Sequence, residues 1–337
     1  MEPDPVDVSV IVRSFNRLPS LCELVAALLT QATNGARFEI VIVEQSTEVS
    51  EVASARLSEL ARDPRVRVLR HPPLGGPRAR NVGVRASRGA ILLFMDDDDL
   101  PDGNGWIAAH LRNYDDPACL GVSGRHVIAG SEGRAPYRNL EKARRQVLSY
   151  TPLLMWPRGW PRCDRPRKVE LWMGGNSSLR RQTVIRFGLW DECTTIEDEL
   201  SFCFRVRAHK RPDEYLKFDA DATMLRRLDI PGGMNKRAMG PFRYMRRLFD
   251  LFHHVIGHYF PARLALLYPA YVVLAYVVTL DWIWNEFSQR GSWVRRFGAS
   301  TILFAALPLL WTSWFAKLAW RRLADGPAEH APQLTLS

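Results

Sequence analysis

Four consecutive carboxylates, Asp96 to Asp99, follow directly after an apolar run at residues 91–95. Five apolar residues in a row, with no polar alternation, are typical of a strand buried on both faces of a parallel sheet. In an open α/β sheet, ligands bind just beyond the carboxyl ends of the strands. Alternate carboxylates at a strand end point the same way, so Asp96 and Asp98 are candidate ligands of a hard cation, Mg²⁺ or Mn²⁺. The alternative is a solvated acidic turn, with Asp102 as the cap of the next helix.

Strands and helices alternate along the chain before this acidic turn. Short β-branched or apolar runs at residues 8–12, 38–43 and 66–69 predict strands. Helices are predicted at residues 18–31, from Thr47 or Ser50 to about residue 62, and at residues 77–86. This alternation indicates βαβ units and a parallel sheet, whose strand ends should converge on one cleft.

Polar side chains follow the predicted strands at the point where each strand ends. A carboxylate there can accept hydrogen bonds from a base or a ribose, and arginines at a helix start can clamp phosphates. A single polar side chain of this kind is weak evidence, because an arginine on a helix is usually solvated. Their joint occurrence at successive strand ends indicates a binding cleft. The residues are Arg13 and Asn16 after the first strand, Glu44 after the second, and Arg78, Arg80 and Asn81 after the third.

The order of these motifs resembles the family-2 glycosyltransferases of GT-A fold over residues 6–250. The likeness is carried by Val-Ser-Val-Ile-Val-x-Ser-Phe-Asn-Arg, Ile-Val-Ile-Val-Glu, Gly-Gly-Pro-Arg-Ala-Arg-Asn-x-Gly and Phe-Met-Asp-Asp-Asp-Asp. The resemblance implies an α/β fold, the GT-A (nucleotide-diphospho-sugar transferase) fold, with a Rossmann-like mixed sheet and helices on both faces. It also implies a nucleotide-diphosphate-sugar donor, a divalent cation (Mn²⁺ or Mg²⁺) at the Asp-x-Asp motif, and inversion at the anomeric carbon.

The resemblance also assigns individual residues. Glu44 stands where the family binds the base, and Arg80 stands where a basic residue meets the nucleotide. Asp96 falls near the ribose and the metal, and Asp98 is the main metal ligand. The other candidates for binding the nucleotide sugar are Arg13, Asn16, Arg78, Asn81, Asp97, Gly175 and Asn176.

Two segments of the second half continue the likeness. Gly174 begins a Gly-Gly-Asn segment, where a tight backbone approaches the donor sugar or the acceptor in the family. The alternative is an ordinary glycine turn before a helix at residues 180–187. Residues 194–205 resemble the helix start that supplies the general base of an inverting transfer. Asp198 is the predicted base, and Glu197 and Glu199 are alternates because the match allows either register.

The acidic helix start has a structural alternative, since the helix dipole favours carboxylates in a first turn. The chain also departs from the family at one point. The family often has a histidine close to the metal at the end of the next strand, and residues 215–227 contain none. Arg226 or Arg227 is a candidate to meet the diphosphate instead.

Hydrophobic segments follow the predicted catalytic domain. Residues 242–259 combine basic residues with an apolar stripe at helical spacing, which fits a membrane-surface helix or a helix that caps the catalytic core. The uncharged stretches 264–280 and 297–316 are near the length of a bilayer span, with in-plane or re-entrant helices as the alternative. We therefore expect a GT-A domain at 1–240 (nucleotide-binding half 6–120, acceptor-binding half 121–240), an interface helix at 241–262, two hydrophobic transmembrane helices at 263–320 and a polar tail at 321–337.

Composition narrows the class of protein. The 337 residues are 47% hydrophobic and 10% aromatic, which excludes a disordered chain. A net charge of +10 suits an anionic partner, and the sequence contains no recognisable motif of a nucleic-acid-binding module. Five scattered cysteines without a C-x-x-C motif indicate reduced thiols, and the acidic N-terminus lacks the apolar stretch of a signal peptide.

The sequence thus predicts an inverting, divalent-metal-dependent glycosyltransferase at the cytosolic face of the cytoplasmic membrane. It would move one sugar to a glycan or lipid-linked acceptor in cell-surface polysaccharide assembly, with membrane lipids and no nucleic acid as partners. One alternative is a polyprenyl-phosphate sugar synthase. A non-enzymatic alternative is an inactive GT-A domain that serves as a membrane scaffold or a nucleotide sensor.

Overall fold

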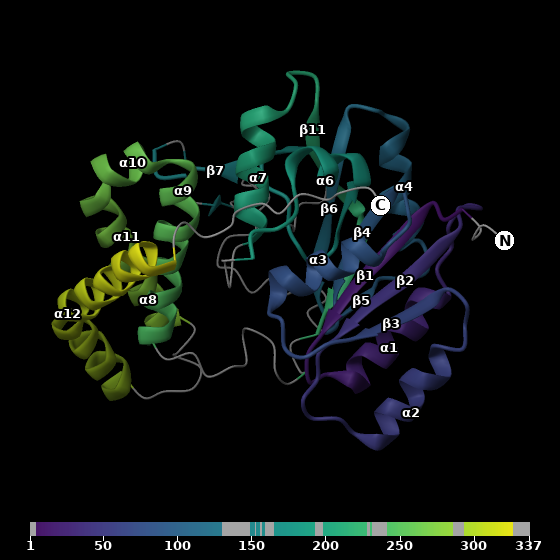
Figure 1. The fold of residues 1–337 in the computed structure, drawn as a ribbon, viewed down its shortest axis with the longest axis horizontal. Coiled ribbons are helices and arrows are strands. Elements are labelled where there is room, and N and C mark those ends of the chain that lie inside the picture. Colours follow the sequence, from purple (N-terminus) through teal and green to yellow (C-terminus); the bar gives the residue numbers. More distant parts are fainter. Residues whose placement is uncertain are drawn as a thin grey trace. The chain divides into compact units, whose positions relative to one another are not determined.

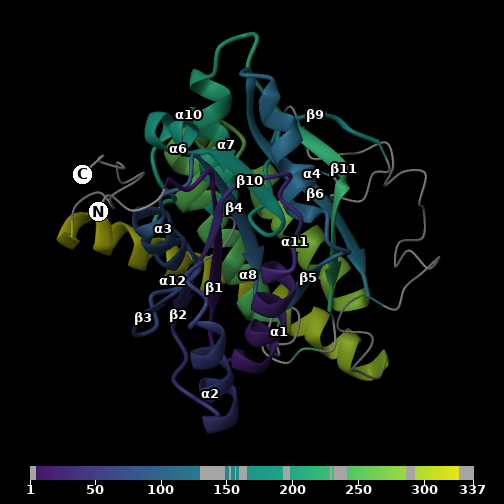
Figure 2. The same cartoon turned by 90° about the vertical axis from the view of Figure 1, so that its right-hand side faces the viewer.

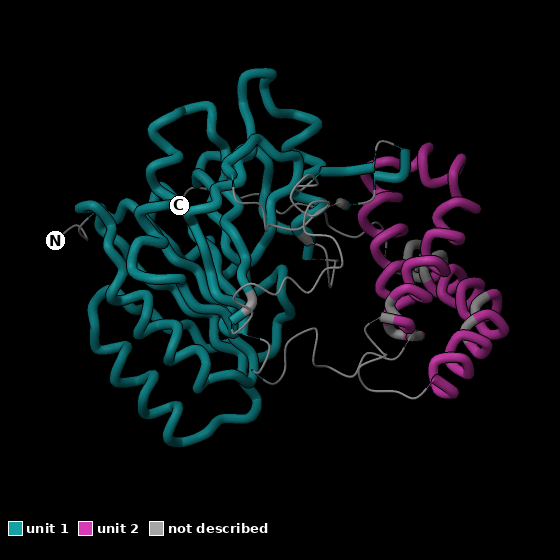
Figure 3. Tube along the Cα trace, turned by 180° about the vertical axis from the view of Figure 1, so that it is seen from behind, with its two compact units in different colours: residues 1–233, 331–337 teal, residues 234–330 magenta. Residues whose placement is uncertain are grey.

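The structure is a computed structural model that describes residues 5–129, 149–151, 153–155, 157–158, 165–192, 198–227, 230, 241–285 and 293–325. The chain divides into two compact units (Figure 3). The first comprises residues 1–233 with 331–337, and the second comprises residues 234–330. The first unit carries a large mixed sheet, and the described part of the second unit is helical.

The first unit begins with a regular alternation of strands and helices (Figure 1). Strands expected at residues 8–12, 38–43, 66–69 and 91–95 are present, and so are the three helices between them. Ser50 caps the second helix by accepting a hydrogen bond from the Ala53 amide. The elements are β1 (Val8–Ser14), α1 (Leu18–Leu29), β2 (Phe38–Glu44), α2 (Glu51–Leu60), β3 (Val66–Arg70), α3 (Gly76–Ala86) and β4 (Ile91–Asp96).

The remainder of the first unit completes the sheet. Its elements are β5 (Asp99–Pro101), α4 (Trp106–Leu111), a 3₁₀ turn (Arg112–Asp115), β6 (Cys119–Ile128), β7 (Ser149–Tyr150), β8 (Pro157–Arg158), β9 (Arg167–Val169), β10 (Ser177–Arg180), α6 (Arg181–Phe187), α7 (Asp198–His209) and β11 (Tyr215–Arg226). The strand order is β3-β2-β1-β4-β10-β6-β11-β5, and β9 pairs antiparallel with the start of β11, at residues 216–218. The pairs among β1 to β4 are parallel, whereas β10 runs antiparallel to both of its neighbours.

Alternate residues of the central strands point into two different helical layers. Val10 and Leu93 belong to a core that also contains the apolar side chains of α1, α2 and α4. On the other side, α3 lies so close to the sheet that a Cβ on Gly83 would collide with Ile11. Figure 2 shows α1 and α4 on one side of β1 and β4, and α3 and α6 on the other. A mixed sheet with helices on both faces is therefore confirmed.

The described part of the second unit is a helical bundle. Its elements are α8 (Pro241–Asp250), a π-helical turn (Leu251–Ile256), α9 (Gly257–Tyr259), α10 (Pro261–Leu266), α11 (Tyr268–Asn285) and α12 (Trp293–Asp325). The apolar stripe of α8 packs inside this unit, where Phe249 meets Trp311 and Trp314 edge-on. The Trp311 indole donates a hydrogen bond of 2.6 Å to the Tyr268 hydroxyl, which links α12 to α11.

The hydrophobic helices of the second unit are short or bent. Among the described residues, no helix alone combines the length and the apolar character that a bilayer span needs. The two arms of α12, Trp293–Ala306 and Pro308–Lys317, meet the criteria only as a pair, with a bend of 53° between them. In α11 the apolar part is confined to Tyr268–Asp281. A bent pair of this kind is the geometry of a broken span or of a re-entrant segment.

Candidate active site

The carboxyl ends of three neighbouring strands meet at one edge of the sheet. In the parallel register, Arg13 of β1 pairs with Asp96 of β4, and Ser14 of β1 pairs with Glu44 of β2. This places Arg13 and Asp96 at the same level on adjacent strands, with Glu44 one residue further along. The predicted convergence of the strand ends is therefore confirmed, and it follows from the parallel pairing.

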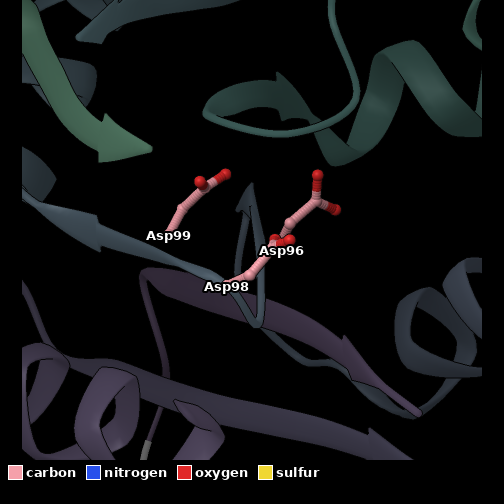
Figure 4. A group of neighbouring side chains, drawn as sticks. All are labelled: Asp96, Asp98 and Asp99. Carbon is pink, nitrogen blue, oxygen red and sulfur yellow. The ribbon is translucent and has the colours of Figure 1, made fainter. Parts of the chain in front are cut away.

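The acidic turn contains both buried and partly exposed carboxylates, and Figure 4 shows three of them, Asp96, Asp98 and Asp99. Asp96 ends β4 and Asp99 begins β5. Asp97 and Asp99 are 1% and 0% exposed, so the alternative of a solvated turn is wrong for these two residues. One carboxylate oxygen from each of Asp96, Asp98 and Asp99 lies within 4.8 Å of the others. The sequence pointed to Asp96 and Asp98, and the structure adds Asp99 to this acidic cluster.

Arginines surround every carboxylate of the turn. Arg13 Nη2 lies 3.5 Å from Asp96 Oδ1, and Arg17 lies 3.0 Å from Asp97 Oδ1 and 2.5 Å from Asp98 Oδ2. Arg226 reaches both Asp96 and Asp99. Sequence reasoning missed Arg17, whose only signal was its place directly after Asn16 in the first strand-end motif.

Burial and arginine charge act on these carboxylates in opposite directions. Burial raises the pKa of Asp96, but the nearby arginines outweigh burial and lower that pKa to about 2. For Asp97, burial outweighs Arg17 and raises the pKa to about 7. Burial likewise raises the pKa of Asp99 to about 7 despite Arg226. Asp96 is therefore held as an anion at the mouth of the turn, as a cation ligand has to be.

A second charged group lies beside the acidic turn. Arg80 of α3 is only 2% exposed, and its Nη2 lies 3.2 Å from Oε1 of Glu199. The guanidinium also stands over the rings of Trp190 and Phe94, at 5.1 Å and 6.0 Å. Glu199 lies in the first turn of α7, which begins at Asp198. Of the other predicted bases, Glu197 and the side chain of Asp198 lie outside the described residues.

Two glycines connect these two charged regions. A Cβ on Gly174 would strike both Glu199 Oε1 and Arg80 Nη2. A Cβ on Gly175 would lie 2.6 Å from Asp96 Oδ2. The acidic turn and the start of α7 are thus neighbours across a single pair of glycines. A small hollow lies beside Asp96 and Gly174, and it is lined by Ile11, Arg13, Arg80, Phe94, Met95, Asp96 and Gly174.

Three predicted asparagines have their side chains engaged by the protein. Asn176 is 0% exposed, and its Oδ1 accepts from Trp106 Nε1 at 2.7 Å while its Nδ2 donates to two backbone carbonyls. Asn81 is equally buried, and it bonds to both the amide and the carbonyl of Trp190. Asn16 binds the backbone of Thr47 in the loop after β2. These side chains hold the loops around the cleft in place.

Glu44 and Arg78 differ in how they are held. Glu44 is buried, and its Oε1 accepts from the Ser46 amide at 2.7 Å, while Arg70 lies 3.6 Å from its Oε2. Arg78 is largely exposed and lies 3.3 Å from Glu192. Glu44 is therefore fixed at the strand edge, and Arg78 lies on the rim.

Comparison with known proteins agrees with this architecture. Residues 9–171 match the family model described as glycosyl transferase family 2. An uncharacterized glycosyltransferase of Haemophilus influenzae is 36% identical over 93 residues, which are 27% of this chain and 29% of that protein. The chain spans less than a third of the length of the curated relatives it matches.

Two solved structures share the fold. One is the mannosyltransferase PcManGT from Pyrobaculum calidifontis in complex with GDP-Man and Mn²⁺, with a TM-score of 0.53 and 16% identity over 96% of this chain and 88% of that chain. The other is GalNAc-T7 with UDP, GalNAc and Mn²⁺, with a TM-score of 0.54 and 15% identity over 73% of this chain and 48% of that chain. At this identity the likeness establishes the fold alone. The family match covers residues 9–171, and the fold of the chain is similar to that of these two glycosyltransferases.

Proposed function

We propose that the protein is an inverting, divalent-cation-dependent glycosyltransferase that moves one sugar from a nucleotide-diphosphate sugar to an acceptor. One observation carries the proposal. The acidic turn that ends β4 and the acidic start of α7 lie on either side of the Gly174–Gly175 pair, next to one hollow. Inverting transfer requires this opposition, because the leaving diphosphate and the base that activates the acceptor act on opposite faces of the sugar.

The donor would lie along the strand ends. Glu44, fixed in the loop after β2, can accept hydrogen bonds from the base or the ribose, and Arg13 and Arg80 bring positive charge toward the diphosphate. The two related structures with Mn²⁺ and a nucleotide or nucleotide sugar support this assignment. Asp97 and Asn176 are buried and engaged by the protein, so their contribution would be to hold the turn and the Gly-Gly-Asn segment in shape.

The acidic cluster fits a divalent cation by its donor set. Its three carboxylates bring oxygens within 4.8 Å of one another, and oxygen is the ligand atom that Mg²⁺ and Mn²⁺ prefer. Asp96 and Asp98 would hold the ion. A bound cation offsets the negative charge that develops on the departing diphosphate.

The base would come from the first turn of α7. Asp198 stays the proposed base, with Glu197 and Glu199 as alternates. The pairing of Glu199 with Arg80 supports a different part for Glu199, because its carboxylate already contacts a buried guanidinium at 3.2 Å. Glu199 would then fix the position of Arg80 and of the helix start.

Attachment to a membrane is part of the proposal. Large apolar side chains of α11 and α12 are exposed on the second unit, including tryptophans that suit an interface. They are Val273, Val277, Trp284, Trp293, Val294, Phe297, Ile302, Phe304, Leu309, Phe315 and Trp320. We propose that these helices attach the protein to the cytosolic face of a membrane, where the acceptor is a lipid-linked glycan in cell-surface polysaccharide assembly.

Release of nucleoside diphosphate from a panel of donor sugars, in the presence of Mn²⁺ and membrane extract, tests the activity. We expect one donor to be consumed by the wild type and the rate to fall at least 100-fold in both Asp98→Asn and Asp198→Asn. Arg207→Met is the matched control, because Arg207 pairs with the half-exposed Glu170 and lies on the last turn of α7. Equal, donor-independent background rates in the wild type and both variants would refute the proposal.

A further inference from the structure

Arg226 lies between two carboxylates of the acidic cluster. Its Nη2 is 3.2 Å from Asp99 Oδ2 and its Nε is 3.3 Å from Asp99 Oδ1, so the guanidinium holds both oxygens of Asp99. The same Nη2 lies 3.6 Å from Asp96 Oδ2. Both oxygens of the fully buried Asp99 are therefore bonded to Arg226, whereas Asp96 lies near both Arg226 and Arg13.

The backbone fixes Arg226 in this place. β11 pairs antiparallel with β5, and Arg226 is the direct partner of Asp99 in that ladder. The preceding two pairs, Leu225 with Leu100 and Met224 with Pro101, lock the same register. A guanidinium that starts from a paired strand residue cannot move far from the turn, in contrast to one on a free loop.

A divalent cation on Asp96 and Asp98 therefore meets a competitor. It has to share Asp96 with Arg226, it finds Asp99 already held on both oxygens, and it lies near a fixed positive charge that repels it. Each of these effects weakens binding of the ion alone. The phosphate oxygens of a donor act the other way, because they add both negative charge and ligand atoms.

We propose that Arg226 is a positioning residue that lowers the affinity of the acidic cluster for a divalent cation, so that the cation binds tightly only together with the donor diphosphate. This inference rests on the proposed function, because it takes the acidic cluster as the cation site. It assigns Arg226 a part in the order of binding, since an enzyme of this kind would bind little metal before its donor.

Direct binding of Mn²⁺ in the absence of nucleotide, followed by the electron paramagnetic resonance of the free ion, tests the proposal. We expect Arg226→Met to bind Mn²⁺ at least tenfold more tightly than the wild type. Because this change leaves Asp99 buried without its partner, the double variant Arg226→Met/Asp99→Asn is measured alongside it and should show the same gain. Arg207→Met, which removes an arginine from a distant ion pair, should leave the affinity unchanged.

The outcomes separate this inference from the proposed function. Mn²⁺ affinities within twofold of the wild type in both Arg226 variants, or weaker binding, would overturn the role of Arg226 while Asp98→Asn still tests the cation site. Loss of binding in Asp98→Asn together with a tenfold gain in the Arg226 variants supports both. If no variant binds Mn²⁺, the inference is refuted, and donor consumption without added metal then decides whether glycosyl transfer itself stands.

Discussion

Gly175 sets the position of the Asp96 carboxylate, and a single methyl group there tests how much that position matters. A Cβ at Gly175 would lie 2.6 Å from Asp96 Oδ2 and 3.1 Å from its Cγ. To reach an ordinary contact of about 3.4 Å, the carboxylate has to move by nearly 1 Å. A misplacement of about 1 Å at a reacting centre can lower a rate on the order of 100-fold. We therefore expect kcat/KM of Gly175→Ala to fall by about 10- to 100-fold.

The fold should tolerate this change. The Asp96 side chain is partly exposed and can turn toward solvent, so the free energy of unfolding should change by less than about 1 kcal/mol. Gly105→Ala is the matched control, because Gly105 has φ of −100° and nothing lies within 4 Å of an added Cβ. Steady-state kinetics with the donor found in the panel, together with urea unfolding of each variant, makes the comparison. Wild-type kcat/KM in Gly175→Ala would refute the claim that the position of Asp96 controls the reaction.

Three further predictions concern the neighbouring contacts. Gly174→Ala should push Glu199 and Arg80 apart and lower kcat at least tenfold with a smaller change in KM, and equal kinetics would show that their pairing is dispensable. Asn176→Ala should lower the free energy of unfolding by about 2–4 kcal/mol, because groups of Trp106, Arg125 and Ala222 lose their hydrogen bonds to Asn176. A loss below about 1 kcal/mol in urea unfolding would contradict this prediction. Burial lowers the pKa of His110 from 6.5 to about 4, so the unfolded chain binds more protons than the folded one between these values. The neutral His110 therefore contributes about 3 kcal/mol to the free energy of unfolding, which is complete above pH 6.5 and is lost as the pH falls through about 4. In urea unfolding at pH 7.5 and 4.5, His110→Gln should lack that part of the pH dependence.

The parallel half of the sheet could be predicted because its signals are local. Apolar runs such as residues 91–95 define buried strands, and parallel pairing brings Arg13, Glu44 and Asp96 to one edge whatever the loops do. The family resemblance, and no local pattern, pointed to the Gly-Gly-Asn segment, whose two glycines do lie beside Asp96 and Glu199. The residue types at the strand ends therefore predicted most of the residues that the structure brings together in the candidate site.

The partners of those residues could not be predicted, because they depend on contacts between distant segments. The sequence proposed Arg226 or Arg227 for the diphosphate, but only the pairing of β11 with β5 shows that Arg226 lies opposite Asp99. An asparagine in a motif can bind a ligand or satisfy buried backbone groups. The Asn176 side chain satisfies buried groups, because it accepts a hydrogen bond from Trp106 and donates one to the backbone of β11. No local sequence pattern predicts that these two segments meet at Asn176.

The hydrophobic segments show a different limit. Hydropathy along residues 264–280 and 297–316 predicted two bilayer spans, with in-plane or re-entrant helices as the alternative. It does not report the bend in α12 between Trp293–Ala306 and Pro308–Lys317, because a proline removes a backbone hydrogen bond without making the segment more polar. Such a bend is the geometry of a broken span or of a re-entrant segment, and cysteine labelling from each side of a vesicle would test whether the two arms enter a bilayer.

The central claim is that the acidic turn and the start of α7 enclose one donor site. The most direct measurement is the anomalous scattering of Mn²⁺ in crystals soaked with Mn²⁺ and the nucleoside diphosphate of the preferred donor. We predict one strong peak at about 2.0–2.6 Å from oxygens of Asp96 and Asp98, with the diphosphate between this peak and the Gly174–Gly175 pair. A Mn²⁺ peak elsewhere on the protein, or a nucleotide bound away from these strand ends, would contradict the account.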